Sequence, residues 1–463
     1  MKTADIHIVY LIGIGGIGMS ALARYFKAEG KIVCGYDKTP TPLTSQLVEE
    51  GIDIHFEDQK ENIPFFQKLE NGELQKEEVL LIYTPAIPVQ HEELNYLKAK
   101  GFIPHKRSEI LGLLTQEKFT IAIAGTHGKT TTSSMVTQML TYSKTPCIGF
   151  LGGISKNFMN NMILPLRSEI QNALVVVEAD EYDRSFLSLH PDIAIITSMD
   201  ADHLDIYGTE GHMAESYNQF ASLLKTSGKL IVKSGLPIQA PHMTYSIYEP
   251  ADYEGMHIRI ENHRYVFDVK TPYGIIKDLR IGLPGRHNVE NAVAALAVGI
   301  ELHISESDIR KSFELYSGVK RRFEKIIENT DITYIDDYAH HPEEIRALLS
   351  SVNEMYPGKK IMGIFQPHLY SRTRDFAGAF AESLSLLNEL ILLDIYPARE
   401  LPIEGVTSQI IAQQIKSHCH ASITTKEEAL EMVKKMKPEV LLTIGAGDID
   451  TLVEPLKHLF EKK

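Results

Sequence analysis

The chain has few cysteines, no excess of basic residues and no long apolar run. Its three cysteines, Cys34, Cys147 and Cys419, are too few and too scattered in 463 residues for a disulfide framework, which fits a reducing cytosol. A formal net charge of -14 argues against non-specific nucleic-acid binding, which needs a basic face. No segment approaches ~18 uninterrupted apolar residues, and the N-terminus lacks a signal-peptide cleavage pattern. These absences predict a soluble, cytoplasmic protein that binds neither nucleic acid nor membrane.

Low-complexity segments and short-period repeats are also absent, and the chain is instead an alternation of apolar strands and helical segments. That alternation predicts the α/β class, with parallel sheets covered on both faces. A length of 463 residues fits about three domains. We expect a Rossmann-like domain over residues 1–115, a central P-loop ATPase-like domain over 116–322 and a second Rossmann-like α/β domain over 323–463.

The most informative motif is the heptapeptide Gly125-Thr126-His127-Gly128-Lys129-Thr130-Thr131. It follows an apolar run at 119–124 and precedes a predicted helix at 131–140, which is the layout of a nucleoside triphosphate cradle. Backbone N–H groups and the positive end of the helix would face the phosphates, Lys129 would reach the β/γ-phosphates, and Thr130 would help to hold Mg²⁺. Only Thr126 and His127 separate Gly125 from Gly128, so this is a shortened variant of the usual loop. We predict an ATP or GTP phosphate site.

A second glycine motif, Gly13-Ile14-Gly15-Gly16-Ile17-Gly18, follows the predicted strand at 6–12. It satisfies the G-x-G-x-x-G pattern, and Asp37 follows a further strand at 31–35. Taken alone, the pattern predicts a dinucleotide site or a tight turn that packs a helix on a strand without any ligand. The glycine pattern cannot separate NAD from another nucleotide that carries a diphosphate and a ribose.

Acidic side chains follow two predicted strands of the central domain, at 173–179 and 193–198. Ligands of parallel sheets lie beyond the carboxyl ends of the strands, and Mg²⁺ prefers oxygen ligands, so Glu178 is a candidate metal ligand. His203 is well placed but is a second-choice ligand for Mg²⁺. The cluster of Asp200, Asp202 and Asp205 is equally consistent with a metal site and with a solvated turn. His418-Cys419-His420 has no partner pair nearby in the sequence, and we interpret it as structural.

Seven motifs in order along the chain resemble the Mur ligases, the ATP-dependent amino-acid ligases of peptidoglycan precursor assembly. Besides the heptapeptide, they are Glu178-Ala179-Asp180-Glu181, Asp202-His203-Leu204-Asp205, Gly285-Arg286-His287-Asn288 with Asn291, Arg321-Arg322-Phe323-Glu324, Asp336-Asp337-Tyr338-Ala339-His340-His341-Pro342 and Gly445-Ala446-Gly447-Asp448. The resemblance spans residues 6 to about 450. Single motifs are weak to moderate, but seven in register over three domains are highly specific.

The resemblance implies an activity and its substrates. The first glycine motif and the His-His-Pro box are most similar to the members that join L-alanine to UDP-N-acetylmuramate. In those enzymes ATP activates the sugar carboxylate as an acyl phosphate, the amine attacks, and UDP-N-acetylmuramoyl-L-alanine, ADP and phosphate result. The expected cofactors are ATP and Mg²⁺, and the expected assembly is a monomer or a homodimer. The first domain would then hold a UDP-sugar rather than NAD.

The resemblance also assigns residues to each substrate. The expected UDP-sugar residues are Gly13, Gly15, Gly16, Ile17, Gly18, Met19, Ser20, Asp37, Thr84 and Arg107. The expected ATP residues are Gly125, Thr126, His127, Gly128, Lys129, Thr130, Thr131, His287, Asn291, Arg322 and Asp336. Thr130, Glu178 and His203 would hold the metal, and Tyr338, His368 and Arg372 would bind the amino acid. The expected catalytic set is Lys129, Glu178, His203, Arg322 and His340.

Two positions depart from the pattern of the alanine-adding members or of their sisters. Leu369 follows the histidine of Gln366-Pro367-His368, where a basic residue is common, which leaves Arg372 and Arg374 to hold the incoming carboxylate. Several sister ligases carry a CO₂-modified lysine about fifteen residues beyond the Asp-His motif. Asn218 occupies roughly that place here, so we expect no carbamylated lysine.

The sequence alone is also compatible with three other functions. The nearest is a recycling ligase that joins UDP-N-acetylmuramate to a preformed tripeptide, although the run at 366–374 favours the alanine enzyme. An NAD(P)-dependent oxidoreductase would explain the first glycine motif but not the second loop or the acidic strand ends. A non-catalytic nucleotide-binding module is the third. For a ligase, we expect domain closure around hinges at about residues 108–118 and 318–324.

Overall fold

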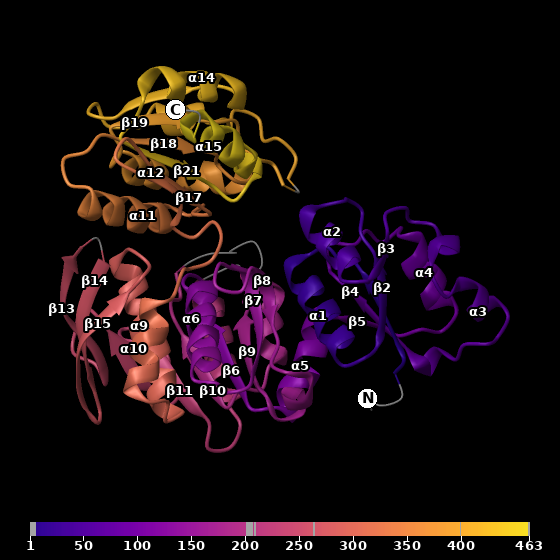
Figure 1. The fold of residues 1–463 in the computed structure, drawn as a ribbon. Coiled ribbons are helices and arrows are strands. Elements are labelled where there is room, and N and C mark those ends of the chain that lie inside the picture. The colour runs from indigo at the N-terminus through magenta and orange to yellow at the C-terminus, as the bar shows by residue number, and fades with distance from the viewer. Residues whose placement is uncertain (1–5, 201–206, 208–209, 263, 399, 462–463) are drawn as a thin grey trace. The chain divides into compact units, whose positions relative to one another are not determined.

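Parallel β-sheets form the framework of the protein, which we describe from a computed structural model (Figure 1). The structure describes residues 6–200, 207, 210–262, 264–398 and 400–461. The chain divides into two compact units, one of residues 1–254 with 293–312 and one of residues 255–292 with 313–463. No described helix is long and apolar enough to cross a membrane. The expected α/β class is confirmed, while the three domain boundaries stay a prediction.

The first unit begins with a five-stranded parallel sheet in the order β3-β2-β1-β4-β5. The central strand β1 is buried along its whole length, as expected for an apolar strand covered on both faces. The elements are β1 (Ile8–Ile12), α1 (Ile17–Ala28), β2 (Ile32–Tyr36), α2 (Pro42–Glu49), β3 (Asp53–His55), α3 (Phe66–Glu70), β4 (Val79–Tyr83), α4 (Glu92–Ala99), β5 (Pro104–Lys106) and α5 (Arg107–Glu117). The first expected hinge, at 108–118, coincides with helix α5.

A second sheet of the first unit carries the heptapeptide at 125–131, which we call the phosphate loop after its predicted role. The strands of this sheet that belong to the first unit follow the order β12-β11-β10-β6-β9-β7-β8. All neighbours are parallel except the hairpin of β7 and β8. The elements are β6 (Thr120–Ala124), α6 (Lys129–Tyr142), β7 (Cys147–Ser155), β8 (Asn160–Ile163), β9 (Leu174–Ala179), β10 (Ile193–Ile196), α8 (Glu210–Ser222), β11 (Lys229–Lys233) and β12 (Met243–Ser246). Because β6, β9 and β10 are neighbours, their polar ends meet at one edge.

Strand β13 (Tyr253–Glu261) begins beside β12 and pairs with it in parallel. The following strands, β14 (Arg264–Thr271) and β15 (Gly274–Ile281), form an antiparallel hairpin in the second unit. The sequence from about 240 to 283 alternates in the manner of antiparallel strands. That prediction holds for β14 and β15 but is wrong for β12 and β13, which pair in parallel, because half-exposed strands alternate in either arrangement. Helices α9 (Arg286–Glu301) and α10 (Glu306–Glu314) follow.

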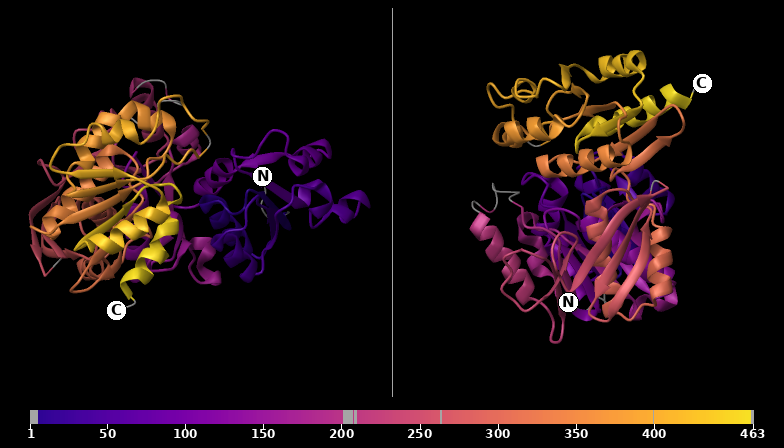
Figure 2. Two further views of the ribbon diagram at one scale, coloured as in Figure 1. Left: turned by 90° about the horizontal axis from the view of Figure 1, so that it is seen from above. Right: turned by 90° about the vertical axis from the view of Figure 1, so that its left-hand side faces the viewer.

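The remainder of the second unit is built on a six-stranded sheet in the order β16-β17-β21-β18-β19-β20. Figure 2 shows this part of the chain, coloured orange to yellow, from two further directions. Helices α14 and α15 cover one face, and α11 and α12 lie on the other, where Phe380 packs against Phe365 of β18. The elements are β16 (Glu324–Glu328), β17 (Thr333–Asp337), α11 (Pro342–Met355), β18 (Ile361–Phe365), α12 (Tyr370–Leu384), β19 (Glu389–Leu392), α13 (Gln409–Ala412), β20 (His420–Ile423), α14 (Lys426–Met436), β21 (Val440–Ile444) and α15 (Val453–Glu461). Only β16 runs antiparallel to its neighbour.

Candidate active site

The phosphate loop lies between the end of β6 and the first residue of α6, as the sequence predicts. Gly125 has φ 134° and Gly128 has φ 84°, both in the region that side chains rarely adopt, so glycine is required at both turns. The end of β10 fixes the loop: the Ser198 hydroxyl accepts from the N–H of His127 at 2.7 Å, and Thr197 Oγ1 donates to the His127 carbonyl at 2.5 Å. The start of α6 follows Gly128 directly, so its free N–H groups face the loop.

Lys129 is the first residue of α6, and its ammonium group is held among acceptors. Nζ lies 2.6 Å from the Glu181 carboxylate and donates to the Gly125 carbonyl at 2.5 Å. Burial alone would lower the pKa of Lys129, but the carboxylates of Glu181, Asp180 and Glu178 outweigh it and raise the pKa above its ordinary value. Lys129 therefore keeps its positive charge in a buried position, as a phosphate-binding lysine must.

The side chains of Glu178 and Thr130 place oxygen atoms side by side next to the phosphate loop. Glu178 lies next to the end of β9, and the Thr130 hydroxyl donates to its two carboxylate oxygens at 2.9 and 3.0 Å. The N–H of Gly152 on β7 also donates to Glu178, at 2.8 Å. A carboxylate and a hydroxyl on neighbouring elements suit a hard cation such as Mg²⁺.

The third expected metal ligand, His203, lies outside the described residues, as do Asp202 and Asp205. Asp200 is described: its N–H donates to Thr126 Oγ1 at 3.1 Å, and its carboxylate lies 3.6 Å from Nε2 of His127. Among the described residues, no group of three or more His, Cys, Asp and Glu side chains could hold a metal. The metal assignments stay predictions.

The first glycine turn joins β1 to α1, and its predicted partners contact it. Asp37 accepts a hydrogen bond from the N–H of Gly15 at 2.7 Å. A Cβ added at Gly18 would lie 2.6 Å from the guanidinium of Arg107, and one added at Gly13 would overlap Thr84. Arg107 also lies 3.9 Å from the Asp180 carboxylate. The structure thus brings Gly13, Gly18, Asp37, Thr84 and Arg107 together, and we call this group the sugar-nucleotide cradle after its predicted role. It leaves no room for a side chain at Gly13 or Gly18.

In the second unit, two guanidinium groups lie over the ring of Tyr338. The Cζ atoms of Arg321 and Arg322 lie 5.1 and 5.3 Å from the ring centroid. Arg321 is bound to Asp336 at 3.2 Å and donates to the Gly445 carbonyl at 2.6 Å, so it links the ends of β17 and β21. Burial raises the pKa of Asp336, and Arg321 opposes that shift.

The neighbouring carboxylate, Asp337, fixes the turn that carries this arginine pair. It accepts from the backbone N–H groups of Phe323 at 2.6 Å and Ala339 at 2.8 Å. Burial raises the pKa of Asp337 to about 6, against the charge of Arg322. Arg322 also lies 3.4 Å from Glu344 on α11. Asp337 belongs to the motif at 336–342, but the sequence alone does not predict this role.

The residues expected to bind the amino acid gather at the carboxyl ends of β17 and β18. The ring of His340 lies 6.0 Å from that of His368, which stacks on Tyr396 at 5.7 Å. Leu369 has φ 72°, an uncommon conformation for a residue with a side chain, and its N–H donates to the Tyr396 carbonyl at 2.9 Å. Arg372, in the first turn of α12, is buried, whereas Arg374 is exposed and paired with Asp375. This difference favours Arg372 as the carboxylate ligand.

His287 and Asn291, the two expected ATP residues of α9, lie on the turns that follow Gly285. A Cβ added at Gly285 would lie 2.5 Å from the His287 ring, so glycine is needed there too. The Asn291 amide donates to Asn288 at 3.4 Å. Burial lowers the pKa of His287 to about 4, and Arg322 adds to the shift. His287 is therefore neutral at physiological pH, and its assignment to ATP stays a prediction.

Several contacts of the site were not predicted from the sequence. Glu181 ends the motif at 178–181 and Ser198 ends the predicted strand at 193–198, so their positions at strand ends are a usable signal. Gly152 carries no such signal, because it is one of 31 glycines and lies within strand β7. Glu344, which contacts both Arg322 and His340, follows a Pro-Glu pair that predicts only the start of a helix.

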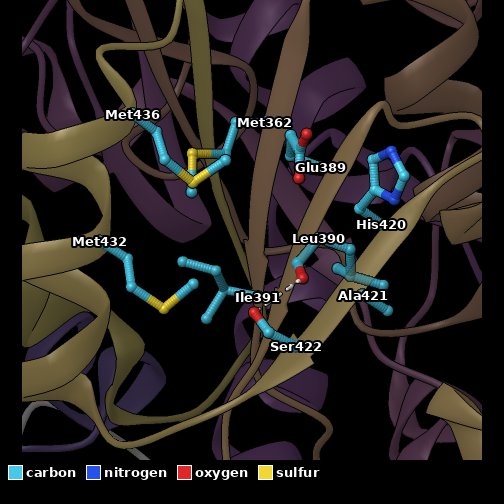
Figure 3. A pocket seen from close by; sticks show the side chains of 9 residues that line it. All are labelled: Met362, Glu389, Leu390, Ile391, His420, Ala421, Ser422, Met432 and Met436. Atoms are coloured by element: carbon cyan, nitrogen blue, oxygen red, sulfur yellow. Dashed lines mark hydrogen bonds between the residues drawn. The ribbon is translucent and has the colours of Figure 1, made fainter.

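A cavity of about 130 Å³ lies elsewhere, against strands β18, β19 and β20 and helix α14 (Figure 3). Its lining includes Met362, Met432 and Met436 with Glu389 and His420. None of these is an expected site residue. His418, two residues before His420, hydrogen-bonds through Nε2 to the Ser385 carbonyl at 2.7 Å.

The buried histidines predict acid sensitivity of the fold. Burial lowers the pKa of His340 to about 4, as for His287, whereas an unfolded chain would protonate both near 6.5. Since the unfolded state then binds more protons between about pH 6.5 and 4, the free energy of unfolding is retained above that window and falls as the pH is lowered through it.

Urea titrations at several pH values measure this dependence. His287→Gln and His340→Gln should each reduce the slope of the unfolding free energy against pH, by an amount that corresponds to at most about one proton taken up on unfolding. His458→Gln, at an exposed side chain, is the matched control. Equal slopes in all four proteins would show that neither buried histidine is responsible.

Comparison with known protein families covers nearly the whole chain. Models described as the catalytic domain of the Mur ligase family, the Mur ligase middle domain and the Mur ligase glutamate ligase domain match residues 8–119, 123–299 and 321–447. The chain therefore belongs to the Mur ligase family, and the expectation of an ATP-dependent ligase is confirmed.

Curated relatives match at full length. The chain is 48% identical to the UDP-N-acetylmuramate–L-alanine ligase of Flavobacterium johnsoniae, over 100% of both chains. It is 47% identical to the Porphyromonas gingivalis enzyme of the same name, over 98% of this chain and 99% of that one.

Solved structures share the fold. The UDP-N-acetylmuramate–alanine ligase MurC of Thermotoga maritima superposes with a TM-score of 0.79 at 26% identity, over 98% of this chain and 99% of that one. A murein peptide ligase from Psychrobacter arcticus has a TM-score of 0.69 at 19% identity, over 99% of both chains, which shows the fold alone.

Proposed function

We propose that this protein uses ATP to join L-alanine to the carboxylate of UDP-N-acetylmuramate, a step of peptidoglycan precursor synthesis that takes place in the cytoplasm. The observation that carries the proposal is the full-length identity of 48% to a ligase of that name. The two nucleotide cradles of the first unit support it, because the reaction needs a sugar nucleotide and a nucleoside triphosphate together. The glycine turn at 13–18 would hold the UDP-sugar diphosphate, and the loop at 125–131 the ATP phosphates.

The reaction begins with activation of the sugar carboxylate. A carboxylate oxygen attacks the γ-phosphorus of ATP, the bond from that phosphorus to the β,γ-bridging oxygen breaks, and an acyl phosphate and ADP form. Lys129, held charged at the loop, would neutralise the charge of the transferring group. Thr130 and Glu178 would hold Mg²⁺, which when bound neutralises phosphate charge.

Amide formation completes the reaction. The neutral amine of L-alanine attacks the acyl carbon, the carbon–oxygen bond to phosphate breaks, and the amine gives up a proton as the amide forms. Arg372 suits the alanine carboxylate, since its planar fork can donate to both oxygens. With a pKa of about 4, His340 is a weak base, so we assign it to hydrogen bonding of the substrates rather than to proton abstraction.

Replacement of Arg372 tests the amino-acid site. Arg372→Lys keeps the charge but loses the two-pronged geometry, so we expect KM for L-alanine to rise about tenfold while kcat changes little. Arg346→Lys, at a half-exposed arginine of α11, is the control. Steady-state phosphate release at varied L-alanine measures both constants. An unchanged KM in Arg372→Lys would place the carboxylate elsewhere.

The proposed function is tested by phosphate release from the purified protein with ATP and Mg²⁺. Release should require both UDP-N-acetylmuramate and L-alanine, and mass spectrometry of the product should show one alanine added to the sugar nucleotide. Tight binding of NAD without binding of UDP-N-acetylmuramate would instead support an oxidoreductase. Phosphate release that is independent of alanine would support a nucleotide-dependent binding module.

A further inference from the structure

The hairpin of β7 and β8 contacts both nucleotide cradles of the first unit. On β7, the N–H of Gly152 donates to Glu178, and a Cβ at Gly152 would overlap that carboxylate. Further contacts of the hairpin reach α1, the helix that follows the first glycine turn. Phe150 of β7 packs on Tyr25 with ring centroids 5.9 Å apart, and Asn161 of β8 bonds to groups in the first two turns of the helix. The hairpin is therefore a direct physical link between the two loops.

Asn161 makes the polar part of this link. Its side-chain amide donates to the Ile17 carbonyl at 2.6 Å and to Ser20 Oγ at 3.1 Å, both in the first turn of α1. Its side-chain oxygen accepts from Arg24, one turn further along, at 2.6 Å. Asn161 and Ser20 are fully buried, and Arg24 is 6% exposed. A buried network whose members are all paired has a single arrangement, and loss of one member leaves the others without partners.

Arg24 is fixed from its other side as well. Its guanidinium donates to both carboxylate oxygens of Glu50, at distances between 2.7 and 3.0 Å. Glu50 is the residue at the C-terminal end of α2 (Pro42–Glu49), so it holds the Arg24 side chain against that helix. Asn161 therefore binds an arginine that is already fixed in place. The network sets both the position of α1 and its rotation about its own axis relative to β8.

We infer that Asn161 is a positioning residue, which holds the sugar-nucleotide turn at a fixed place relative to the phosphate loop. This inference rests on the proposed function, in which the carboxylate on one cradle attacks the γ-phosphate on the other. Such a transfer depends on the distance and alignment of two bound substrates, and a displacement of about 1 Å can cost about a hundredfold in rate. Asn161 touches neither substrate in this account and acts through α1.

The inference differs from a purely structural role in what it predicts for each ligand. A structural asparagine affects stability and alters binding and turnover only through loss of folded protein. A positioning asparagine acts through the first turn of α1, where Ile17 and Ser20 are expected UDP-sugar residues, so the affinity for each ligand alone should change much less than kcat. The loss should appear in kcat, when both substrates must be aligned.

The test compares Asn161→Ala and Asn161→Asp with Asn160→Ala. Asn161→Asp keeps the oxygen that accepts from Arg24 but loses the amide that donates to Ile17 and Ser20. Asn160 is the matched control, because its side-chain oxygen accepts from backbone N–H groups of β8 itself, at Asn161 and Met162, and from no other group in the described part of the chain. Binding of UDP-N-acetylmuramate alone and of ADP alone is measured by calorimetry, and kcat by phosphate release per folded molecule.

We expect both Asn161 variants to lose about 10- to 100-fold in kcat, with each single-ligand affinity within about threefold of wild type and with Asn160→Ala unchanged. Retained kcat in Asn161→Ala, or a loss of UDP-N-acetylmuramate affinity as large as the loss of kcat, would overturn the inference. If Asn161→Ala does not fold, the same criteria apply to Asn161→Asp. A wild-type protein without alanine-dependent turnover would instead overturn the proposed function.

Discussion

Lys129→Ala should abolish turnover, by about a thousandfold or more, while UDP-N-acetylmuramate still binds with nearly wild-type affinity. The ammonium group is the one cation that the structure places on the phosphate loop among the described residues, held there by Glu181 and the Gly125 carbonyl. Its loss removes charge stabilisation from the transferring phosphoryl group, where single preorganised groups contribute about 10²- to 10³-fold or more. The glycine turn that would hold the sugar nucleotide belongs to a different sheet, so its affinity should survive.

The controls for this variant address folding. Lys129 and Glu181 form an ion pair at 2.6 Å in which the Glu181 carboxylate is 2% exposed, and removal of one member of a buried ion pair is strongly destabilising. The double variant Lys129→Ala with Glu181→Gln removes that charge and should have a higher melting temperature than Lys129→Ala, while staying inactive. Lys434→Ala, at an exposed lysine of α14, controls for loss of a positive charge. Turnover near the wild-type rate in the double variant would contradict the assigned role of Lys129.

Glu178→Gln should reduce kcat by about a hundredfold and weaken the apparent affinity for Mg²⁺. Glutamine can still accept from the Thr130 hydroxyl and the Gly152 N–H, so the local geometry is retained while the negative charge is lost. A hard divalent cation is bound mainly through charged oxygen ligands, so the charge is what matters.

Rates measured over a range of Mg²⁺ concentrations, together with Mn²⁺ binding in the presence of ADP followed by electron paramagnetic resonance, provide the readout. Glu431→Gln, at an exposed carboxylate of α14, is the matched control. An unchanged Mg²⁺ dependence in Glu178→Gln would show that the cation is held by other residues.

The sequence predicts the loops well because their chemistry requires particular residues. Gly125 and Gly128 adopt φ values that glycine alone tolerates, and Lys129 must begin a helix, so the pattern and the structure agree. The uninterrupted apolar run at 79–83 predicts a strand, and β4 has the same bounds. The ends of β17, β18 and β21 likewise fall at the motifs that begin at Asp336, Gln366 and Gly445.

The contacts that hold these loops could not be predicted in the same way. Asn161 contacts Ile17 and Arg24 across more than a hundred positions of sequence, and no local pattern marks an asparagine whose partners lie that far away. Gly152 has no unusual neighbours in sequence, yet Glu178 leaves no room for a side chain there. The strand direction of β12 and β13 is also decided by the sheet, since alternation predicts a half-exposed strand and not its orientation.

The identity of the acceptor amine is the central claim, and a direct comparison of acceptors tests it. Phosphate release is measured with ATP, Mg²⁺ and UDP-N-acetylmuramate, and with either L-alanine or the tripeptide L-alanyl-γ-D-glutamyl-meso-diaminopimelate as the second substrate. We predict a kcat/KM for L-alanine that exceeds the value for the tripeptide by at least about a hundredfold, with UDP-N-acetylmuramoyl-L-alanine as the product. A preference for the tripeptide would contradict the account and identify a recycling ligase built on the same fold.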